Sequence, residues 1–189
     1  MSLISISTDT YDNFRSDALA RAAQNLGYDV DGYYGYQCWD LAAELWQNIG
    51  FGGGYPLTGP NHYASECWTN SRDANAGDDF DLIYNIVELK RGDVIVIDAS
   101  AVSSTGHIAF CDEDYNGTTS MNLLGQNQVN PSAVYGHIPT VTNLSIATFL
   151  GAFRYHEWEQ PIPPTPTLSK KHFPWVLRSR NLNQMRNQM

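Results

Sequence analysis

The spacing of apolar residues changes once along this chain, and that change constrains the fold more than any other feature. Over residues 9–26 and 38–49, apolar side chains recur every three or four residues, which is the period of an amphipathic helix. From residue 94 onward, short apolar runs alternate with turn signals such as Tyr115-Asn116-Gly117, which is typical of antiparallel strands. Helices followed by antiparallel strands predict an α+β fold.

The expected elements follow from these two patterns. We expect helices over residues 9–26 and 38–49, and a short helix over 64–68 within a glycine-rich irregular stretch. The expected strands cover residues 94–97, 107–111, 121–126 and 151–158.

A proline-rich stretch near the C-terminus divides the chain. Its prolines, which favour a stiff extended linker, are Pro161, Pro163, Pro164 and Pro166. We therefore expect one domain over residues 1–159, a linker over 160–168 and a tail over 169–189. The charge follows the same division, because the domain carries 6 Lys and Arg against 20 Asp and Glu, whereas the linker and tail together carry 5 basic residues and no acidic one.

This charge distribution restricts the partners. An acidic domain argues against nucleic acid as the main partner, because phosphate binding needs clustered cations. The basic tail is either a solubilising extension or a docking peptide. No apolar run approaches the roughly 20 residues of a membrane span. Residues 1–12 lack the features of a signal peptide, so we expect synthesis in the cytoplasm without an export signal.

The chain has three cysteines, Cys38, Cys67 and Cys111. An odd and sparse set is not a disulfide framework, so at least one thiol is expected to be free. Cys38 stands where a polar loop becomes a helix, and a helix N-terminus favours the nucleophilic thiolate. A packed structural cysteine is the alternative interpretation, and it is the preferred one for Cys111 within an alternating strand.

A thiol nucleophile needs an imidazole from elsewhere in the chain. Among the five histidines, His107 is the candidate, because it opens an expected strand directly after Gly106, where the backbone permits close approach. A structural histidine is the alternative.

An acidic loop precedes Cys38. Five residues occupy positions 1, 3, 5, 7 and 12 of a 12-residue stretch, which is the ligand spacing of an EF-hand loop: Asp29, Asp31, Tyr33, Gly35 and Asp40. Tyr33 and Gly35 offer only backbone carbonyls. The spacing predicts a structural Ca²⁺ site, and a solvated acidic turn is the alternative.

Four segments together resemble CHAP domains, the cysteine- and histidine-dependent amidohydrolase/peptidase family of the papain-like superfamily. In chain order they are Gly32-Tyr33-Tyr34-Gly35-Tyr36-Gln37-Cys38-Trp39-Asp40-Leu41, Arg91-Gly92-Asp93-Val94-Ile95-Val96, Gly106-His107-Ile108-Ala109 and Gly125-Gln126-Asn127. The resemblance covers residues 10–158. It implies a papain-like α+β fold in which N-terminal helices pack on a twisted antiparallel sheet, with Cys38 as nucleophile and His107 as its proton carrier.

The third catalytic position departs from the family pattern. Many relatives carry Glu-x-Asn here, with the Glu orienting the histidine, whereas this chain has Gly125 at the Glu position. We expect Asn127, which matches the retained Asn, to orient or support His107, and Gln126 is the alternative. Several phage CHAP domains bind Ca²⁺ at positions that match the five loop residues.

The resemblance implies a bacteriophage enzyme that cleaves an amide bond of bacterial peptidoglycan, as a muramoyl-alanine amidase or as a crossbridge endopeptidase. Such an enzyme is made in the infected host's cytoplasm and reaches the wall after release by holin or within the virion, and the tail would then dock on a virion protein or an anionic wall polymer. Two alternatives are a non-catalytic, calcium-stabilised structural or wall-binding virion module on a CHAP fold, which Gly125 favours, and an intracellular papain-like protease, which the acidic loop disfavours.

Overall fold

The computed structural model describes residues 6–49, 60–75, 79–99, 103–129 and 135–158. The expected linker (160–168) and tail (169–189) lie outside these residues. Within these ranges the α-helices are α1 (Tyr11–Ala22), α2 (Cys38–Ile49) and α3 (Glu66–Asn75), and Ile86–Glu88 form a 3-10 turn. The strands are β1 (Phe80–Ile83), β2 (Val94–Ile97), β3 (His107–Cys111), β4 (Ser120–Gly125), β5 (Thr140–Ser145) and β6 (Phe149–Tyr155). The α+β prediction is confirmed.

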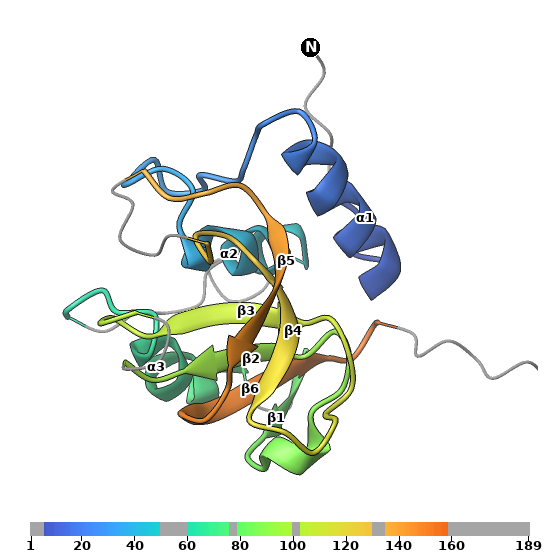
Figure 1. The fold of residues 1–189 in the computed structure, drawn as a ribbon, viewed down its shortest axis with the longest axis vertical. Coiled ribbons are helices and arrows are strands. Elements are labelled where there is room, and N and C mark those ends of the chain that lie inside the picture. The colour runs from blue at the N-terminus through green and yellow to red at the C-terminus, as the bar shows by residue number, and fades with distance from the viewer. Residues whose placement is uncertain (1–5, 50–59, 76–78, 100–102, 130–134, 159–189) are drawn as a thin grey trace, which may run out of the picture.

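The strands form one antiparallel sheet in the order β1-β6-β2-β3-β4-β5 (Figure 1). Strands β2 and β3 lie in its middle, and every residue of both strands is buried. Burial on both faces explains why β2 and, after His107, β3 are apolar at every position, whereas an alternating pattern was expected for the strand with Cys111.

Each face of the sheet contributes to a separate core. Val94, Val96 and Phe110 face the helices and pack in the larger core. Their neighbours Ile95 and Ile97 point to the opposite face, into the smaller core, because successive strand side chains alternate.

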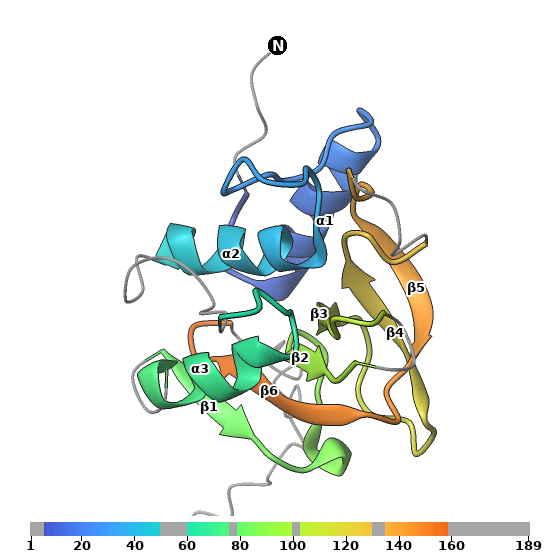
Figure 2. The same ribbon diagram turned by 90° about the vertical axis from the view of Figure 1, so that its left-hand side faces the viewer.

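Helix α2 packs across β3, which is visible when the molecule is turned (Figure 2). Its apolar side, including Leu41, Leu45 and Trp46, is fully buried. This packing brings the first turn of α2 to the start of β3, so the fold itself places residue 38 near residue 107.

Helix α1 is held by aromatic contacts and by one ion pair. Thr10 caps its N-terminus by accepting from the Asn13 backbone N–H. The Phe14 and Phe110 rings lie 4.7 Å apart between centroids. Arg15 binds Asp112 through two nitrogens, at 2.6 and 2.9 Å.

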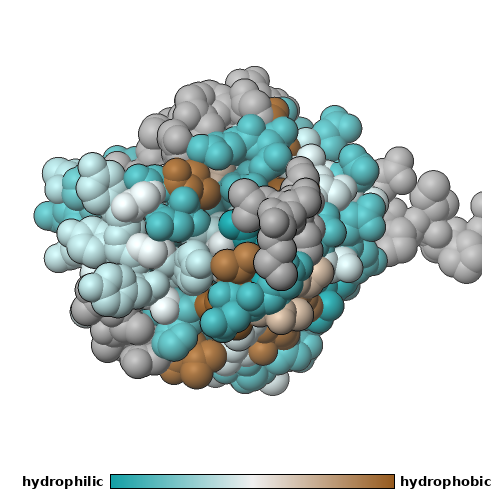
Figure 3. Space-filling model, turned by 90° about the horizontal axis from the view of Figure 1, so that it is seen from above, coloured by the Kyte–Doolittle hydropathy of each residue, from teal (hydrophilic) through white to brown (hydrophobic). Residues whose placement is uncertain are grey.

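Most of the coloured surface seen from above is hydrophilic, with scattered apolar residues (Figure 3). Within the described ranges, the helices are too short and too polar to cross a bilayer.

The expected bounds of α2, β2 and β3 agree with the structure. Helix α1 is shorter than the predicted 9–26, and α3 begins two residues later and extends further than the predicted 64–68. Strand β4 begins and ends one residue earlier than predicted, and β6 covers 149–155 rather than 151–158. The sequence interpretation missed β1 and β5.

Candidate active site

Cys38 is the first residue of α2, and its side chain is half-buried. A backbone hydrogen bond from Ile108 acts on its thiol, so the sulfur lies against the start of β3, where His107 is the preceding residue. Burial raises the pKa of the Cys38 thiol to about 11, and the hydrogen bond from Ile108 opposes that shift. The thiol is therefore protonated at neutral pH.

His107 is the first residue of β3 and is 1% exposed. Its Nε2 atom lies 3.2 Å from the Oε1 atom of Gln128. Burial lowers the pKa of His107 to about 4, against the smaller opposite effect of the Gln128 hydrogen bond. At neutral pH the Cys38 thiol and the His107 imidazole are thus both uncharged, so a nucleophilic Cys38 would have to lose its proton as it attacks a substrate.

Gly106 sets the approach to His107. It has a φ of +77°, and a Cβ atom built there would lie 2.6 Å from the Ile97 carbonyl oxygen and 2.7 Å from the Ser65 Cβ. Only glycine fits both the conformation and the space. This is the close approach that the sequence predicted.

Three consecutive amide side chains follow β4, and each makes its own set of hydrogen bonds. Gln126 hydrogen-bonds to the backbone of Tyr28 and of Gln37. Asn127 donates to the Gln37 side chain, with an Nδ2–Oε1 distance of 2.8 Å. Gln128 contacts His107. All three are buried, so this turn ties the loop before Cys38 to the histidine.

The partner of His107 in the structure therefore differs from the partner that the sequence predicted. The expected contact was with Asn127, or alternatively with Gln126, but among the described residues it is Gln128 that bonds to the imidazole. Asn127 has a φ of +53°, which ends the strand alternation and turns its side chain toward Gln37. Its Oδ1 atom is buried without a partner in the described part of the chain. Sequence reasoning missed the role of Gln128. The only sequence signal for that role is an amide side chain three residues after Gly125.

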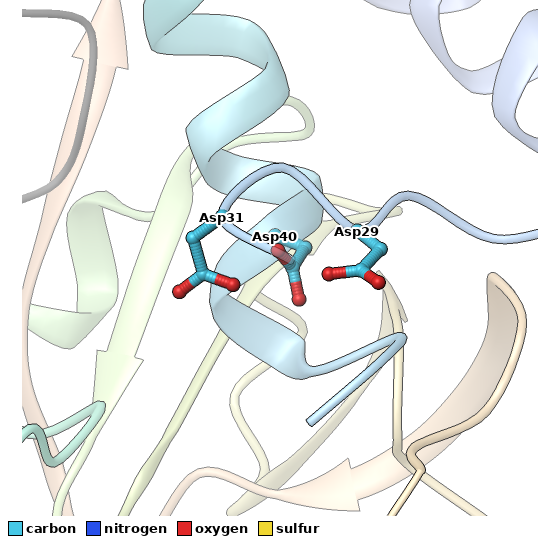
Figure 4. Close-up of side chains that lie close together, drawn as sticks. All are labelled: Asp29, Asp31 and Asp40. Atoms are coloured by element: carbon cyan, nitrogen blue, oxygen red, sulfur yellow. The ribbon is translucent and has the colours of Figure 1, made fainter. Parts of the chain in front are cut away.

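The acidic loop brings three carboxylates together at the start of α2 (Figure 4). One oxygen from each of Asp29, Asp31 and Asp40 lies within 4.8 Å of the others. Because Ca²⁺–oxygen distances are about 2.3–2.6 Å, two oxygens bound to one ion lie at most about 5 Å apart, so the three oxygens fit a single ion. Asp29 and Asp31 are exposed, whereas Asp40 is buried.

Asp40 also shapes the loop. Its two oxygens accept from the backbone N–H groups of Val30 and Gln37, each at 2.8 Å. Burial, the largest cause, raises the pKa of Asp40 to about 7, and the neighbouring Asp31 and Asp29 add to the shift. A bound cation would counter this cost, because it favours the charged carboxylate.

The two remaining predicted ligands lie in the same loop. The Tyr33 backbone N–H donates to Asp31 Oδ1 at 2.8 Å, and the Gly35 carbonyl accepts from the Gln37 N–H at 2.9 Å. Positive φ angles at Gly32, Tyr34 and Gly35 make the loop curl tightly. A carbonyl oxygen has two lone pairs, so the Gly35 carbonyl retains one for an ion.

The loop is joined to the segment after residue 134. The Tyr36 N–H donates to the Tyr135 carbonyl, and the Tyr36 carbonyl accepts from the His137 N–H, both at 3.1 Å. The Asn127 N–H donates in turn to the His137 carbonyl at 3.1 Å. These bonds connect the acidic loop, the 126–128 turn and the chain leading to β5.

Cys67 and Cys111 are free and fully buried. Neither side chain is open to a substrate, whereas Cys38 is half-buried. Cys38 is the half-buried thiol of the three, at the start of a helix that packs on the strand opened by His107.

Comparison with known proteins identifies the family. The profile of the CHAP domain matches residues 27–127, which is more than half of the chain, and the chain therefore belongs to the CHAP domain family. A D-alanyl-L-alanine endopeptidase of Streptococcus phage B30 is 27% identical over 157 residues, which are 82% of this chain and 32% of that protein's length. The solved structure of the endolysin LysIME-EF1 superposes with a TM-score of 0.58 at 24% identity, covering 77% of this chain and 65% of that one.

Proposed function

We propose that this protein hydrolyses an amide bond of bacterial peptidoglycan, as a phage lysin, with Cys38 as its nucleophile. The observation that carries the proposal is the contact between the Cys38 thiol and the start of β3, where His107 is the first residue. Membership of the CHAP family and the similarity to a phage endopeptidase support the substrate class.

The proposed reaction is acyl transfer. His107 takes the thiol proton as the Cys38 sulfur bonds to the substrate carbonyl carbon, which gives a tetrahedral oxyanion. Backbone N–H groups at the start of α2 stabilise that negative charge. The C–N bond then breaks, and the His107 imidazolium donates its proton to the leaving amine, which leaves a thioester on Cys38.

Water completes the cycle. The water oxygen attacks the thioester carbonyl carbon while His107 removes a proton from the water. The C–S bond then breaks. The proton on His107 returns to the Cys38 sulfur, and the free carboxylic acid leaves.

The name of the B30 relative favours a peptide bond as the target, so we propose endopeptidase cleavage ahead of muramoyl-alanine amidase cleavage. Both reactions use the same thiol chemistry. Analysis of the released ends separates them, because an endopeptidase frees amino groups on stem or crossbridge residues, whereas an amidase frees the amino group of the first L-alanine.

We further propose that one Ca²⁺ binds to Asp29, Asp31 and Asp40, with the Tyr33 and Gly35 carbonyls completing the site. The three carboxylate oxygens within 4.8 Å support it. Such an ion would brace the loop that leads into α2 and neutralise the clustered negative charge.

The experiment compares clearing of purified Gram-positive cell walls by wild type, Cys38→Ala and Cys67→Ala, each in Ca²⁺ or in a chelator. We expect wild type and Cys67→Ala to clear walls and Cys38→Ala to clear none although it is folded. Ca²⁺ should increase clearing. If folded wild type clears no wall but still sediments with it, the protein is instead a wall-binding module, the candidate that Gly125 favours.

A further inference from the structure

The chemistry of His107 depends on which ring nitrogen carries the hydrogen when the imidazole is neutral. Only one nitrogen then donates, and the other accepts. His107 Nε2 faces Gln128 Oε1 at 3.2 Å, so the orientation of the Gln128 amide decides between the two tautomers.

The surroundings of Gln128 fix that orientation. Its Nε2 atom donates to two backbone carbonyl oxygens, those of Leu123 at 3.0 Å and Thr140 at 2.9 Å. A flipped amide would place Oε1 against both carbonyls, with no hydrogen between the oxygens. Oε1 therefore faces His107 and can only accept, so the hydrogen lies on His107 Nε2.

Gly125 provides the space that Gln128 occupies. A Cβ atom built on Gly125 would lie 2.8 Å from Gln128 Oε1 and 3.0 Å from Gln128 Cδ. It would also lie 3.0 Å from the Ala109 Cβ. Any larger residue at position 125 would thus displace the Gln128 amide from His107, because the two side chains would need the same space.

We propose that Gln128, lying over Gly125, is the positioning residue of this site, because it holds His107 in the Nε2–H tautomer and leaves Nδ1 as the basic atom that takes the Cys38 proton. The proposal deepens the function proposed above and rests on it for the catalytic consequence. The Gln128 side chain is buried, so water does not readily replace it as the partner of Nε2. Because the amide is neutral, it orients the imidazole without stabilising an imidazolium as a carboxylate would.

Four variants test the assignment. Gln128→Met has a similar length but neither accepts from the imidazole nor donates to the two carbonyls. Gly125→Ala keeps Gln128 and crowds it. Gln128→Glu keeps an acceptor for Nε2–H, and its second oxygen must carry a proton to bond to the Leu123 or Thr140 carbonyl. Gln24→Met is the matched control, because Gln24 is exposed in the turn that follows α1.

The first measurement is ¹⁵N NMR of the imidazole nitrogens in histidine-labelled protein, with His107 assigned by the signal that disappears in His107→Gln. We expect the Nε2–H pattern in wild type and in Gln24→Met. Gln128→Met and Gly125→Ala should shift His107 toward a mixture of tautomers. Gln128→Glu should keep Nε2–H, because a protonated carboxyl can donate to a carbonyl through one oxygen and accept from His107 through the other.

The second measurement is kcat and KM on soluble peptidoglycan fragments. Gln128→Met and Gly125→Ala should lower kcat by roughly 10- to 100-fold with little change in KM, because a misplaced base slows chemistry rather than binding. An Nδ1–H pattern in wild type overturns the proposal. The proposal also fails if Gln128→Met and Gly125→Ala both keep the tautomer and the kcat of wild type. If wild type cleaves nothing but the NMR results are as expected, the positioning of His107 stands and the proposed hydrolysis fails.

Discussion

The side chain of Gln126 hydrogen-bonds to both backbone polar groups of Tyr28, as a neighbouring strand would. Its Oε1 atom accepts from the Tyr28 N–H at 2.6 Å, and its Nε2 atom donates to the Tyr28 carbonyl at 3.0 Å. The same Nε2 atom donates to the Gln37 carbonyl at 2.9 Å. One buried amide from the end of β4 thus holds both ends of the acidic loop.

Gln126→Ala should therefore destabilise the whole domain. It removes three hydrogen bonds worth about 1 kcal/mol each and leaves a buried N–H unsatisfied, so we expect a loss of about 2–4 kcal/mol in unfolding free energy. Urea unfolding at fixed Ca²⁺ measures it, with Gln24→Ala as the exposed control. A loss no larger than that of the control would contradict the role assigned to Gln126.

Asp31→Asn should have opposite effects with and without Ca²⁺. Without the ion, it relieves repulsion among three carboxylates, so the variant should be at least as stable as wild type. With Ca²⁺ at about 100 times the dissociation constant, wild type should gain about 2.7 kcal/mol and the variant much less. Thermal unfolding in chelator and in Ca²⁺ gives both values. Asp9→Asn, an exposed change outside the loop, should respond as wild type does, and an equal Ca²⁺ response in Asp31→Asn would contradict the ligand set.

Arg154→Met should leave a buried charge unpaired. Arg154 binds Asp93 through two nitrogens, at 2.8 and 2.7 Å, and Asp93 is 1% exposed. Removing one partner of such a pair costs about 3–5 kcal/mol. The double variant Asp93→Asn/Arg154→Met should recover part of this loss in denaturant unfolding, and no recovery would indicate that packing, not charge, dominates.

The stability of the protein should fall in acid partly because of His107. Burial lowers its folded pKa to about 4, below the ordinary value of 6.5, so between these values the unfolded state binds a proton that the folded state does not. Linkage then lowers the unfolding free energy as pH falls through this window, by about 2 kcal/mol at about pH 5 relative to about pH 7.5. The drop should be smaller by that amount in His107→Gln. Other groups titrate in both proteins, so the difference between the two curves isolates His107, and parallel curves would contradict its low pKa.

The sequence was sufficient for the central elements of the fold. Helix α2 and strands β2 and β3 are strongly apolar because they are buried, and their predicted bounds agree with the structure. Strand β5 was missed because it is half-exposed beside β4 at the edge of the sheet, so its sequence, Thr140–Ser145, shows little apolar alternation. Strand β1 is only four residues long.

The site was predictable where spacing or motif determines position. The carboxylates of Asp29, Asp31 and Asp40 lie together as their spacing indicates. Which of three consecutive amides faces His107 was not predictable, because the answer depends on the positive φ of Asn127. Strand alternation would have put residue 127 on the same face as Gly125, whereas the left-handed turn brings Gln128 there instead.

The 126–128 turn also determines how this site can fail. Because one short segment binds the acidic loop, the residue before the nucleophile and the histidine, its displacement would release all three together. Damage to the site should therefore be all-or-none rather than graded, and the backbone amides of Tyr28, Asn127 and His137 should exchange with solvent at a common rate, as one cooperative unit.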